Sequence, residues 1–303
     1  MENNGSKSAG LKIKVGDVIF YIFLYVFMIL FCIITLYPVL NTLAISFNDG
    51  VDAMRGGVHL WPRMFTTQNY TTVLALRNIG RGAIISVLRT VIGTVLAVVA
   101  NALLAFIVSQ KNYVFRSQLS LFWVITMYVN GGMIPIMLLY RTLHLTNSFW
   151  VYVIPGMISA FNMLVMRTYM EGLPDSLQEA AQIDGAGYMK IFVSIVSPLC
   201  KPIYATVALF VAVGQWNSWF DTMLYNRMAD QYTTLQYELM KMLSAVTSLK
   251  GNAGAATTGT SVNITPISVR AAATIITMAP IVMLYPFLQR YFVAGLTIGG
   301  VKE

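Results

Sequence analysis

Residues 171–202 read EGLPDSLQEAAQIDGAGYMKIFVSIVSPLCKP, and they hold the densest acidic cluster of the chain. The acidic residues are Glu171, Asp175, Glu179 and Asp184. The preceding residues 53–170 contain no acidic residue at all, and strongly apolar stretches lie on both sides of the cluster. We therefore expect a polar, water-exposed surface between two membrane-embedded parts of the chain.

The composition of the 303 residues indicates a polytopic membrane protein. Hydrophobic residues make up 57% and charged residues 11%, whereas about a quarter of the residues are charged in soluble domains. The net charge of +8 comes from basic residues scattered over many loops, which favours weak attraction to membrane lipid over nucleic-acid binding. Cys32 and Cys200 lie in or beside apolar stretches, so we expect buried thiols rather than a disulfide or a metal site.

Six apolar stretches are long enough to cross a membrane. The first, residues 18–40, is uncharged and crosses the ~30 Å hydrocarbon core at about 1.5 Å per residue. Lipid admits only helices or closed barrels, and these stretches are too long for barrel strands. The predicted fold class is an all-α membrane protein with six transmembrane helices. The other five stretches are residues 82–108, 119–140, 149–166, 203–220 and 271–289.

The orientation follows from basic residues near the ends of the spans. Lys111 and Arg116 against a lone Arg141 mildly favour cytosolic N- and C-termini. The acidic segment, residues 171–198, then lies in the cytosol between the fourth and fifth spans. The predicted parts are a cytosolic tail (1–17), a first helix with an outer loop (18–81), a core of five helices (82–294) that includes an outer loop (221–270), and a cytosolic C-terminal tail (295–303).

The predicted spans contain no Asp, Glu or His. Proton- or sodium-coupled carriers usually keep carboxylates or histidines at membrane depth, because they bind and release a cation there. Metal and acid–base enzymes are disfavoured for the same reason, since no carboxylate pair, metal-ligand spacing or Ser-His-Asp set is present. We therefore expect a transport path that is passive or powered by another protein.

Arg89 is the one charged residue within the predicted spans. The simpler interpretation is that it snorkels to the outer headgroups; the alternative is that it faces a polar path. Amide and indole side chains match the hydroxyls and apolar faces of a sugar, and the segment GQWNSWF concentrates them. Helix contacts or interfacial aromatics would explain the same residues. The candidate path residues are Arg89, Asn130, Asn162, Gln215, Trp216, Asn217 and Trp219.

The acidic segment predicts two short helices joined by an elbow. Asp175 is suited to an N-cap, with Gln178 completing a capping box, and Gly185 lies where a helix end favours a left-handed residue. The second run, YMKIFVSIV, ends at Pro198. One face of the first helix would carry Leu177, Ala180, Ala181 and Asp184. The GAGYMK stretch lacks the Gly-Lys-Ser/Thr of a phosphate-binding loop, so we expect no ATP hydrolysis by this chain.

These residues resemble the EAA motif of the permeases of ABC importers. The motif is read in Glu179-Ala180-Ala181, Gly185, Ile195 and Pro198, with Ser197 in place of the usual Leu. Asp184-Gly185-Ala186-Gly187 is similar to the carbohydrate-uptake branch. Three further stretches, LLAFIVSQKN, LHLTNSFWVYVIPG and LQRYFVAGLTIGGVKE, extend the likeness over most of residues 80–303.

The resemblance implies the permease of an ATP-driven importer in a bacterial plasma membrane. Glu179, Ala180, Ala181, Asp184, Gly185 and Gly187 would form the segment that couples it to an ATPase. The implied partners are a second homologous permease, two cytosolic ATPase subunits that bind ATP and Mg²⁺, and a solute-binding protein. The implied substrate is a sugar or oligosaccharide, such as one derived from alginate, pectin or host glycans. An ATP-independent secondary carrier or channel is the alternative.

Overall fold

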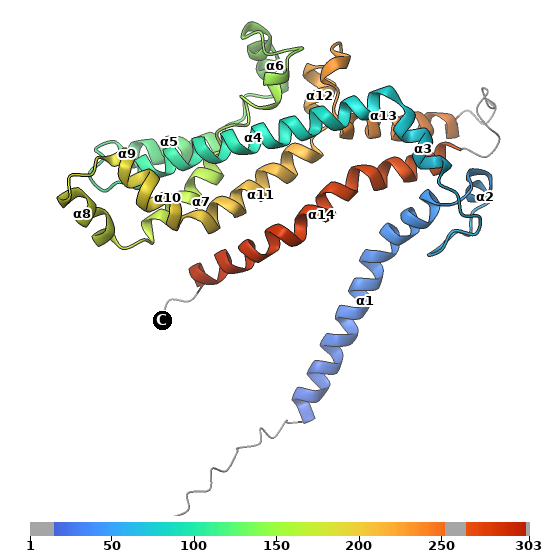
Figure 1. The fold of residues 1–303 in the computed structure, drawn as a ribbon, viewed down its shortest axis with the longest axis horizontal. Coiled ribbons are helices and arrows are strands. Elements are labelled where there is room, and N and C mark those ends of the chain that lie inside the picture. The colour runs from blue at the N-terminus through green and yellow to red at the C-terminus, as the bar shows by residue number, and fades with distance from the viewer. Residues whose placement is uncertain (1–14, 252–264, 301–303) are drawn as a thin grey trace, which may run out of the picture. The chain divides into compact units, whose positions relative to one another are not determined.

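The computed structural model describes residues 15–251 and 265–300, and within them the chain is helical, without a named strand. It divides into two compact units, Met1–Asn69 with Thr260–Ala272 and Tyr70–Gly259 with Ala273–Glu303. The main helices are α1 (Val15–Ser46), α2 (Gly50–Met54), α3 (Gln68–Ala75), α4 (Arg77–Ser109), α5 (Arg116–Tyr128), α6 (Met133–Thr142), α7 (Ala160–Glu171), α8 (Asp175–Ile183), α11 (Lys201–Asn217), α12 (Phe220–Tyr225), α13 (Leu235–Gly251) and α14 (Pro266–Gly300) (Figure 1).

In the first unit, α1 exposes apolar side chains along its length, as expected for a helix that faces lipid. The connection after it is held by two buried amides. Asn48 Oδ1 accepts hydrogen bonds from the backbone N–H groups of Arg63 and Met64 at 2.8 and 2.9 Å. Asn69 Nδ2 donates to the carbonyl oxygens of Ser46 and Asn48, both at 2.9 Å.

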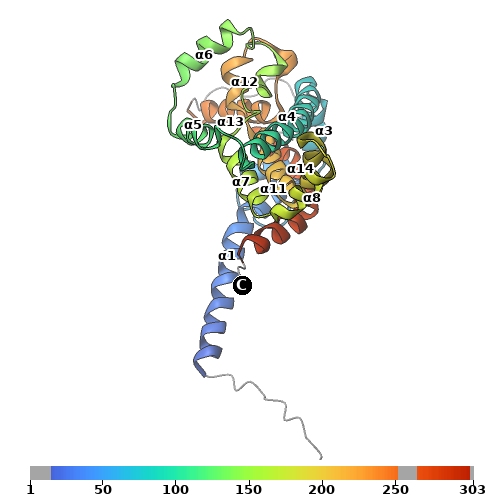
Figure 2. The same cartoon turned by 90° about the vertical axis from the view of Figure 1, so that its left-hand side faces the viewer.

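In the second unit, α4, α7 and α11 pack together along their lengths (Figure 2). Small side chains of α4 allow this close approach: a Cβ added to Gly93 would lie 2.9 Å from Nε2 of Gln215 on α11. Asn101 of α4 donates to the carbonyl of Met157 at 3.0 Å and accepts from the N–H of Ser159 at 3.0 Å. These bonds fix the entry into α7, so Asn101 joins helices rather than facing solvent.

The predicted spans are only partly continuous helices. Three helices among the described residues are long and apolar enough to cross a membrane, in α1, α4 and α14, and the number rises to five if two bent pairs each count as one span. The predicted span 119–140 breaks between α5 and α6, which meet at 116°. The predicted span 149–166 consists of a 3₁₀ turn, η1 (Phe149–Tyr152), a loop and the start of α7. The count of six spans stays a prediction.

The break between α5 and α6 has a local cause. Asn130 Oδ1 accepts a hydrogen bond from the N–H of Gly132 at 2.9 Å. Gly132 has a φ of 84°, a conformation that glycine adopts without a steric cost. Asn130 therefore shapes a turn in the chain here, and its role in a transport path stays a prediction.

The ends of the chain lie partly outside the described residues. The predicted N-terminal tail, residues 1–17, is described only from residue 15, where α1 begins. The predicted C-terminal tail, residues 295–303, continues α14 as far as Gly300. The polar part of the predicted outer loop, residues 252–264, lies outside the described residues.

Candidate functional site: a capped helix at one end and a polar cavity within the helices

The first helix of the acidic segment, α8, ends as the sequence predicts. Gly185 follows the C-cap with a φ of 77°. Its N–H donates to the carbonyl of Gln182 at 3.0 Å, and the N–H of Ala186 donates to the carbonyl of Ala181 at 2.9 Å. This pair of bonds is the Schellman motif, which satisfies the last carbonyl groups of a helix.

The beginning of α8 differs from the prediction. Pro174 is the N-cap, and Asp175 is the first helical residue without a capping hydrogen bond. The Asp175 carboxylate instead forms an ion pair with Lys111, in the loop between α4 and α5. Beside it, Gln110 Nε2 donates to Gln178 Oε1 at 3.2 Å. The capping box was therefore a wrong interpretation, because partners from a distant loop bind both side chains.

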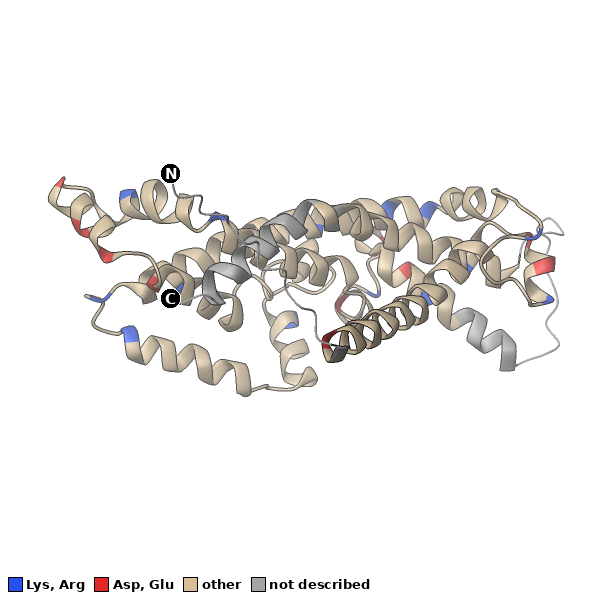
Figure 3. Cartoon of the chain, turned by 90° about the horizontal axis from the view of Figure 1, so that it is seen from below, with Lys and Arg blue, Asp and Glu red and all other residues tan. Residues whose placement is uncertain are grey.

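The four acidic residues fall into two pairs with different surroundings. Figure 3 shows acidic residues gathered at the α8 end of the second unit. Burial raises the pKa of Glu171, but hydrogen bonds from Arg167 and Arg116 outweigh that effect and hold its pKa below the usual value. Glu179 and Asp184 are exposed and form no ion pair within the described part of the chain. One pair holds the segment in place, and the other faces outward.

The outward face of α8 is partly apolar. The Ile183 side chain is 87% exposed, and Leu177 is 42% exposed. Ala180, Gly185 and Gly187 are exposed as well, so no large side chain covers this surface apart from Ile183 and Leu177. An exposed Ile beside two unpaired carboxylates is a typical composition for a protein-binding surface.

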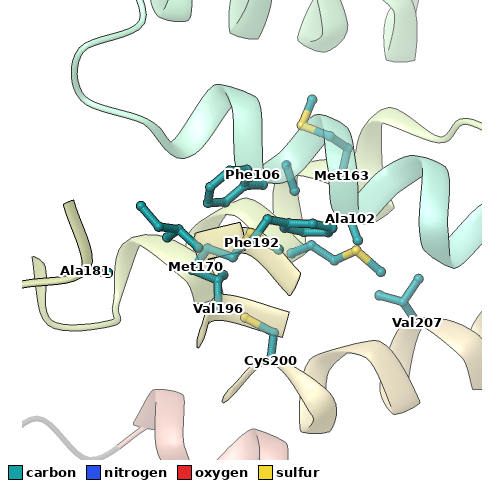
Figure 4. Close-up of a cluster of buried hydrophobic side chains, with 12 residues drawn as sticks. Ala102, Phe106, Met163, Met170, Ala181, Phe192, Val196, Cys200 and Val207 are labelled. Atoms are coloured by element: carbon teal, nitrogen blue, oxygen red, sulfur yellow. The ribbon is translucent and has the colours of Figure 1, made fainter. Parts of the chain in front are cut away.

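The inward face of the segment joins the core of the second unit. Ala181 is buried, in contrast to the rest of the predicted coupling set, and belongs to a cluster of buried side chains from α4, α7, α11 and the acidic segment (Figure 4). Phe106 of α4 packs on Phe192 with ring centroids 5.1 Å apart. The second run consists of α9 (Tyr188–Ile191), a π-helical turn η2 (Phe192–Val196) and α10 (Ser197–Leu199). The acidic segment thus packs directly against the helix bundle.

Arg89 lies in a polar cavity rather than at a headgroup position. Its side chain is 2% exposed, and the guanidinium contacts Asp221 with Nη2 to Oδ2 at 2.5 Å and Nη1 to Oδ1 at 3.2 Å. The expected snorkelling is therefore wrong. A buried arginine needs a counter-charge, because its desolvation is costly, and Asp221 supplies it.

Two further side chains complete the surroundings of Arg89. Gln215 Oε1 accepts from Nε and Nη2 of Arg89 at 3.0 and 2.9 Å, and its Nε2 donates to the carbonyl of Tyr152 at 3.0 Å. The guanidinium carbon also lies 4.3 Å from the centre of the Tyr152 ring. α4, η1, α11 and α12 therefore meet at a single cation.

This cluster lines a cavity of about 440 Å³. Its wall adds Tyr140 and Tyr225, whose ring centroids are 5.0 Å apart. The side chain of Asp221 is 21% exposed and lines the cavity. Its Oδ1 also accepts from the N–H of Thr222 at 2.8 Å, so Oδ2, which is bonded to Arg89 Nη2, is the oxygen better placed for a ligand. Carboxylate, amide and guanidinium groups beside aromatic rings form the combination that binds sugar hydroxyls and stacks on sugar rings.

The other candidate path residues lie elsewhere. Trp216 is buried, and its Nε1 donates to the carbonyl of Thr277 on α14 at 2.9 Å. Asn217 bonds the carbonyl of Val213 on its own helix at 3.0 Å, and Trp219 packs edge-on against Phe220. Asn162 is buried in the first turn of α7. The structure describes all seven candidate path residues, and of these Arg89 and Gln215 alone line the cavity at Arg89.

Asp221 was missed because it lies just beyond the predicted fifth span. Its partner in the ion pair is 132 residues away in sequence. One sequence signal could have led to Asp221. Arg89 is a single arginine in an apolar helix, and such a buried charge predicts a counter-ion nearby. The predicted spans contained no carboxylate, so nothing in those spans indicated that Arg89 has a carboxylate partner.

Comparisons with known proteins agree with this picture. A family described as "Binding-protein-dependent transport system inner membrane component" matches residues 89–298. The polygalacturonan/rhamnogalacturonan transport system permease protein YtcP of Bacillus subtilis (strain 168) is 30% identical over 284 residues, which cover 94% of this chain and 98% of that protein. Protein LplC of the same organism is 32% identical over 272 residues, covering 89% and 90%.

A solved structure shows the same fold. A chain in the crystal structure of a bacterial ABC transporter involved in the import of the acidic polysaccharide alginate superposes with a TM-score of 0.82 at 27% identity. The match covers 92% of this chain and 98% of that chain. The likeness therefore extends over most of the chain.

Proposed function

The chain belongs to the family of binding-protein-dependent transport system inner membrane components, and from this premise we propose that it passes an oligosaccharide through an ATP-driven importer. The observation that carries the substrate class is the cavity at Arg89, where a carboxylate, an amide and three tyrosine rings line the wall together with one cation. Relatives named as permeases for pectin-type and arabino-oligosaccharides support the same class.

ATP hydrolysis belongs, in this proposal, to two cytosolic partner subunits that bind ATP and Mg²⁺. The surface of α8 that carries Glu179, Ile183 and Asp184 would dock on one of them, with Gly185 setting the turn that follows. Ala181 and Phe192 tie this surface to α4 and α7, so closure of the ATPases would move the helices around the cavity. A solute-binding protein would deliver the sugar from the other side, with both termini in the cytosol.

The partner subunits are tested by copurification. An affinity-tagged chain, expressed with the ATPase and the homologous permease, is expected to retain both partners after detergent extraction. Ile183→Glu should release the ATPase and keep the second permease, because it places a third carboxylate on the docking surface. Asp175→Asn, on the tethered side of the same helix, is the control and should keep both.

Recovery of a monomer without an ATPase would overturn the proposal. Retention of the ATPase by Ile183→Glu would place the docking surface elsewhere on the chain while leaving the importer assignment intact.

A further inference from the structure

A second cavity adjoins the one at Arg89. It has a volume of about 330 Å³ and is lined by residues of α6, of the loop that follows α6, of α12 and of the chain just after α12. Tyr225 lines both cavities, and the N–H of Asn147 donates to the carbonyl of Tyr225 at 3.0 Å. The two cavities are therefore neighbours that share one aromatic wall.

The charge of the second cavity is positive and uncompensated. Arg141 from α6 and Arg227 after α12 both line it, and no acidic residue does. Neither guanidinium forms an ion pair within residues 15–251 and 265–300. Arg89 differs in this respect, because Asp221 already neutralises it. Both arginine side chains are exposed, and an anion that enters the cavity would be attracted to both of them.

The remaining polar lining suits a sugar acid. Thr146 and Asn147 add a hydroxyl and an amide beside the two arginines. Asn147 has a φ of 56°, and the bond to Tyr225 holds it in that conformation. Guanidinium groups bind carboxylates through paired hydrogen bonds, whereas the hydroxyl and the amide serve the ring hydroxyls.

We propose that the Arg141–Arg227 cavity is a subsite for the carboxylate of an acidic sugar unit, next to the sugar unit held in the Arg89 cavity. The inference rests on the proposed function, and it specifies in addition that the oligosaccharide carries a negative charge. An oligosaccharide with one uronate would place its carboxylate between the arginines and stack an adjacent ring on Tyr225. Neutral oligosaccharides would bind the Arg89 cavity alone and therefore more weakly.

An anionic lipid headgroup offers the same chemistry of charged oxygens, because interfacial arginines attract it. The experiment therefore uses the assembled importer in nanodiscs of phosphatidylcholine alone and in nanodiscs that contain phosphatidylglycerol. Trigalacturonate and its fully methyl-esterified trimer are titrated calorimetrically at low ionic strength. The two probes differ in their carboxylates, and no solute-binding protein is needed.

In phosphatidylcholine, wild-type importer should bind trigalacturonate at least tenfold more tightly than the ester, since a hydrogen bond to a charged group contributes about that factor. The double variant Arg141→Gln with Arg227→Gln should reduce the preference for trigalacturonate to less than about twofold. Its affinity for the methyl ester should equal that of the wild type. Arg77→Gln, which removes one charge at the exposed start of α4, is the control and should keep the preference.

Four results would overturn the inference. The first is an unchanged preference in the double variant, and the second is an equal loss in Arg77→Gln. The third is a preference that phosphatidylglycerol abolishes, because the lipid headgroup would then occupy the cavity in place of the uronate. If wild-type importer binds neither trimer, the subsite is refuted, whereas the proposed function is judged separately by ATP-dependent uptake.

Discussion

Two groups of ion pairs in the second unit use the same chemistry with different consequences. At the α8 end, Lys111–Asp175 and Arg116–Glu171 join side chains that are 31–69% exposed. In the cavity, the Arg89 side chain is 2% exposed and its partner Asp221 is 21% exposed. Exposed pairs contribute about 0–1 kcal/mol, because water and salt screen both charges. Breaking a buried pair leaves an uncompensated charge, at a cost of about 3–5 kcal/mol.

The difference separates two roles in one chain. Around Arg89, contacts of one buried guanidinium hold α4, η1, α11 and α12 together, so we expect substitutions there to be poorly tolerated. Around α8, weak tethers place a surface that a partner can push. In the proposed mechanism, a partner that pushes on α8 would act on the locked helices through the buried contacts of Ala181 and Phe192.

The largest effect is expected from Asp221→Asn. The substitution leaves the Arg89 guanidinium without its counter-charge, so it should destabilise the chain by about 3 kcal/mol or more and abolish sugar uptake. Thermal unfolding of the purified chain measures the stability. The double variant Arg89→Met with Asp221→Leu should recover part of it, because no lone charge remains, but it should not recover uptake. A single variant as stable as the wild type would refute the buried role of the pair.

A smaller effect is expected at the elbow. Gly185→Ala places a Cβ on a residue with φ of 77°, which costs about 1–2 kcal/mol, although the space around it is open. Gly187→Ala is the matched control, since that site is equally open and its φ is −71°. Uptake per ATP hydrolysed should fall in Gly185→Ala, and further in Gly185→Leu, while Gly187→Ala keeps the wild-type ratio. Equal ratios in all three variants would remove the elbow from the coupling mechanism.

Substitutions of the neighbouring residues Gln215 and Trp216 on α11 should have different effects, one on sugar affinity and the other on stability. Trp216→Phe loses the 2.9 Å bond to the Thr277 carbonyl, so it should lower stability by about 1 kcal/mol and leave sugar affinity unchanged. Gln215→Leu removes a group from the cavity and should weaken sugar binding. Isothermal titration on both variants makes the comparison. Lower affinity in Trp216→Phe alone would return Trp216 to the sugar path.

The smallest effect is expected from Asp175→Asn, which removes the ion pair with Lys111. Because both side chains are more than half exposed, the loss of stability should stay below about 1 kcal/mol and shrink further at high salt. Thermal unfolding at two salt concentrations measures it. A loss as large as that of Asp221→Asn would erase the distinction between the two groups of ion pairs.

Local signals predicted the helical fold and the turn at Gly185, because glycine at a helix end and long apolar runs act through neighbours in sequence. The sequence could not show that Asp221 pairs with Arg89, since those residues meet only in the folded chain. Nor could it separate Gln215 from Trp216: successive helical residues point about 100° apart, and packing alone decides which one faces the cavity. The break at Asn130 did have a local signal, because Asn-Gly-Gly marks a turn, but the apolar residues on both sides favoured a single span.

The most direct test of the whole account is oligosaccharide uptake into proteoliposomes that contain the assembled importer. We expect uptake of an oligosaccharide to require ATP on the side of α8, together with the solute-binding protein on the opposite side. It should be lost in Asp221→Asn, whose cavity lacks its charge balance. Uptake that proceeds equally without ATP, or that follows an imposed ion gradient, would contradict the account and identify the chain as a secondary carrier or channel.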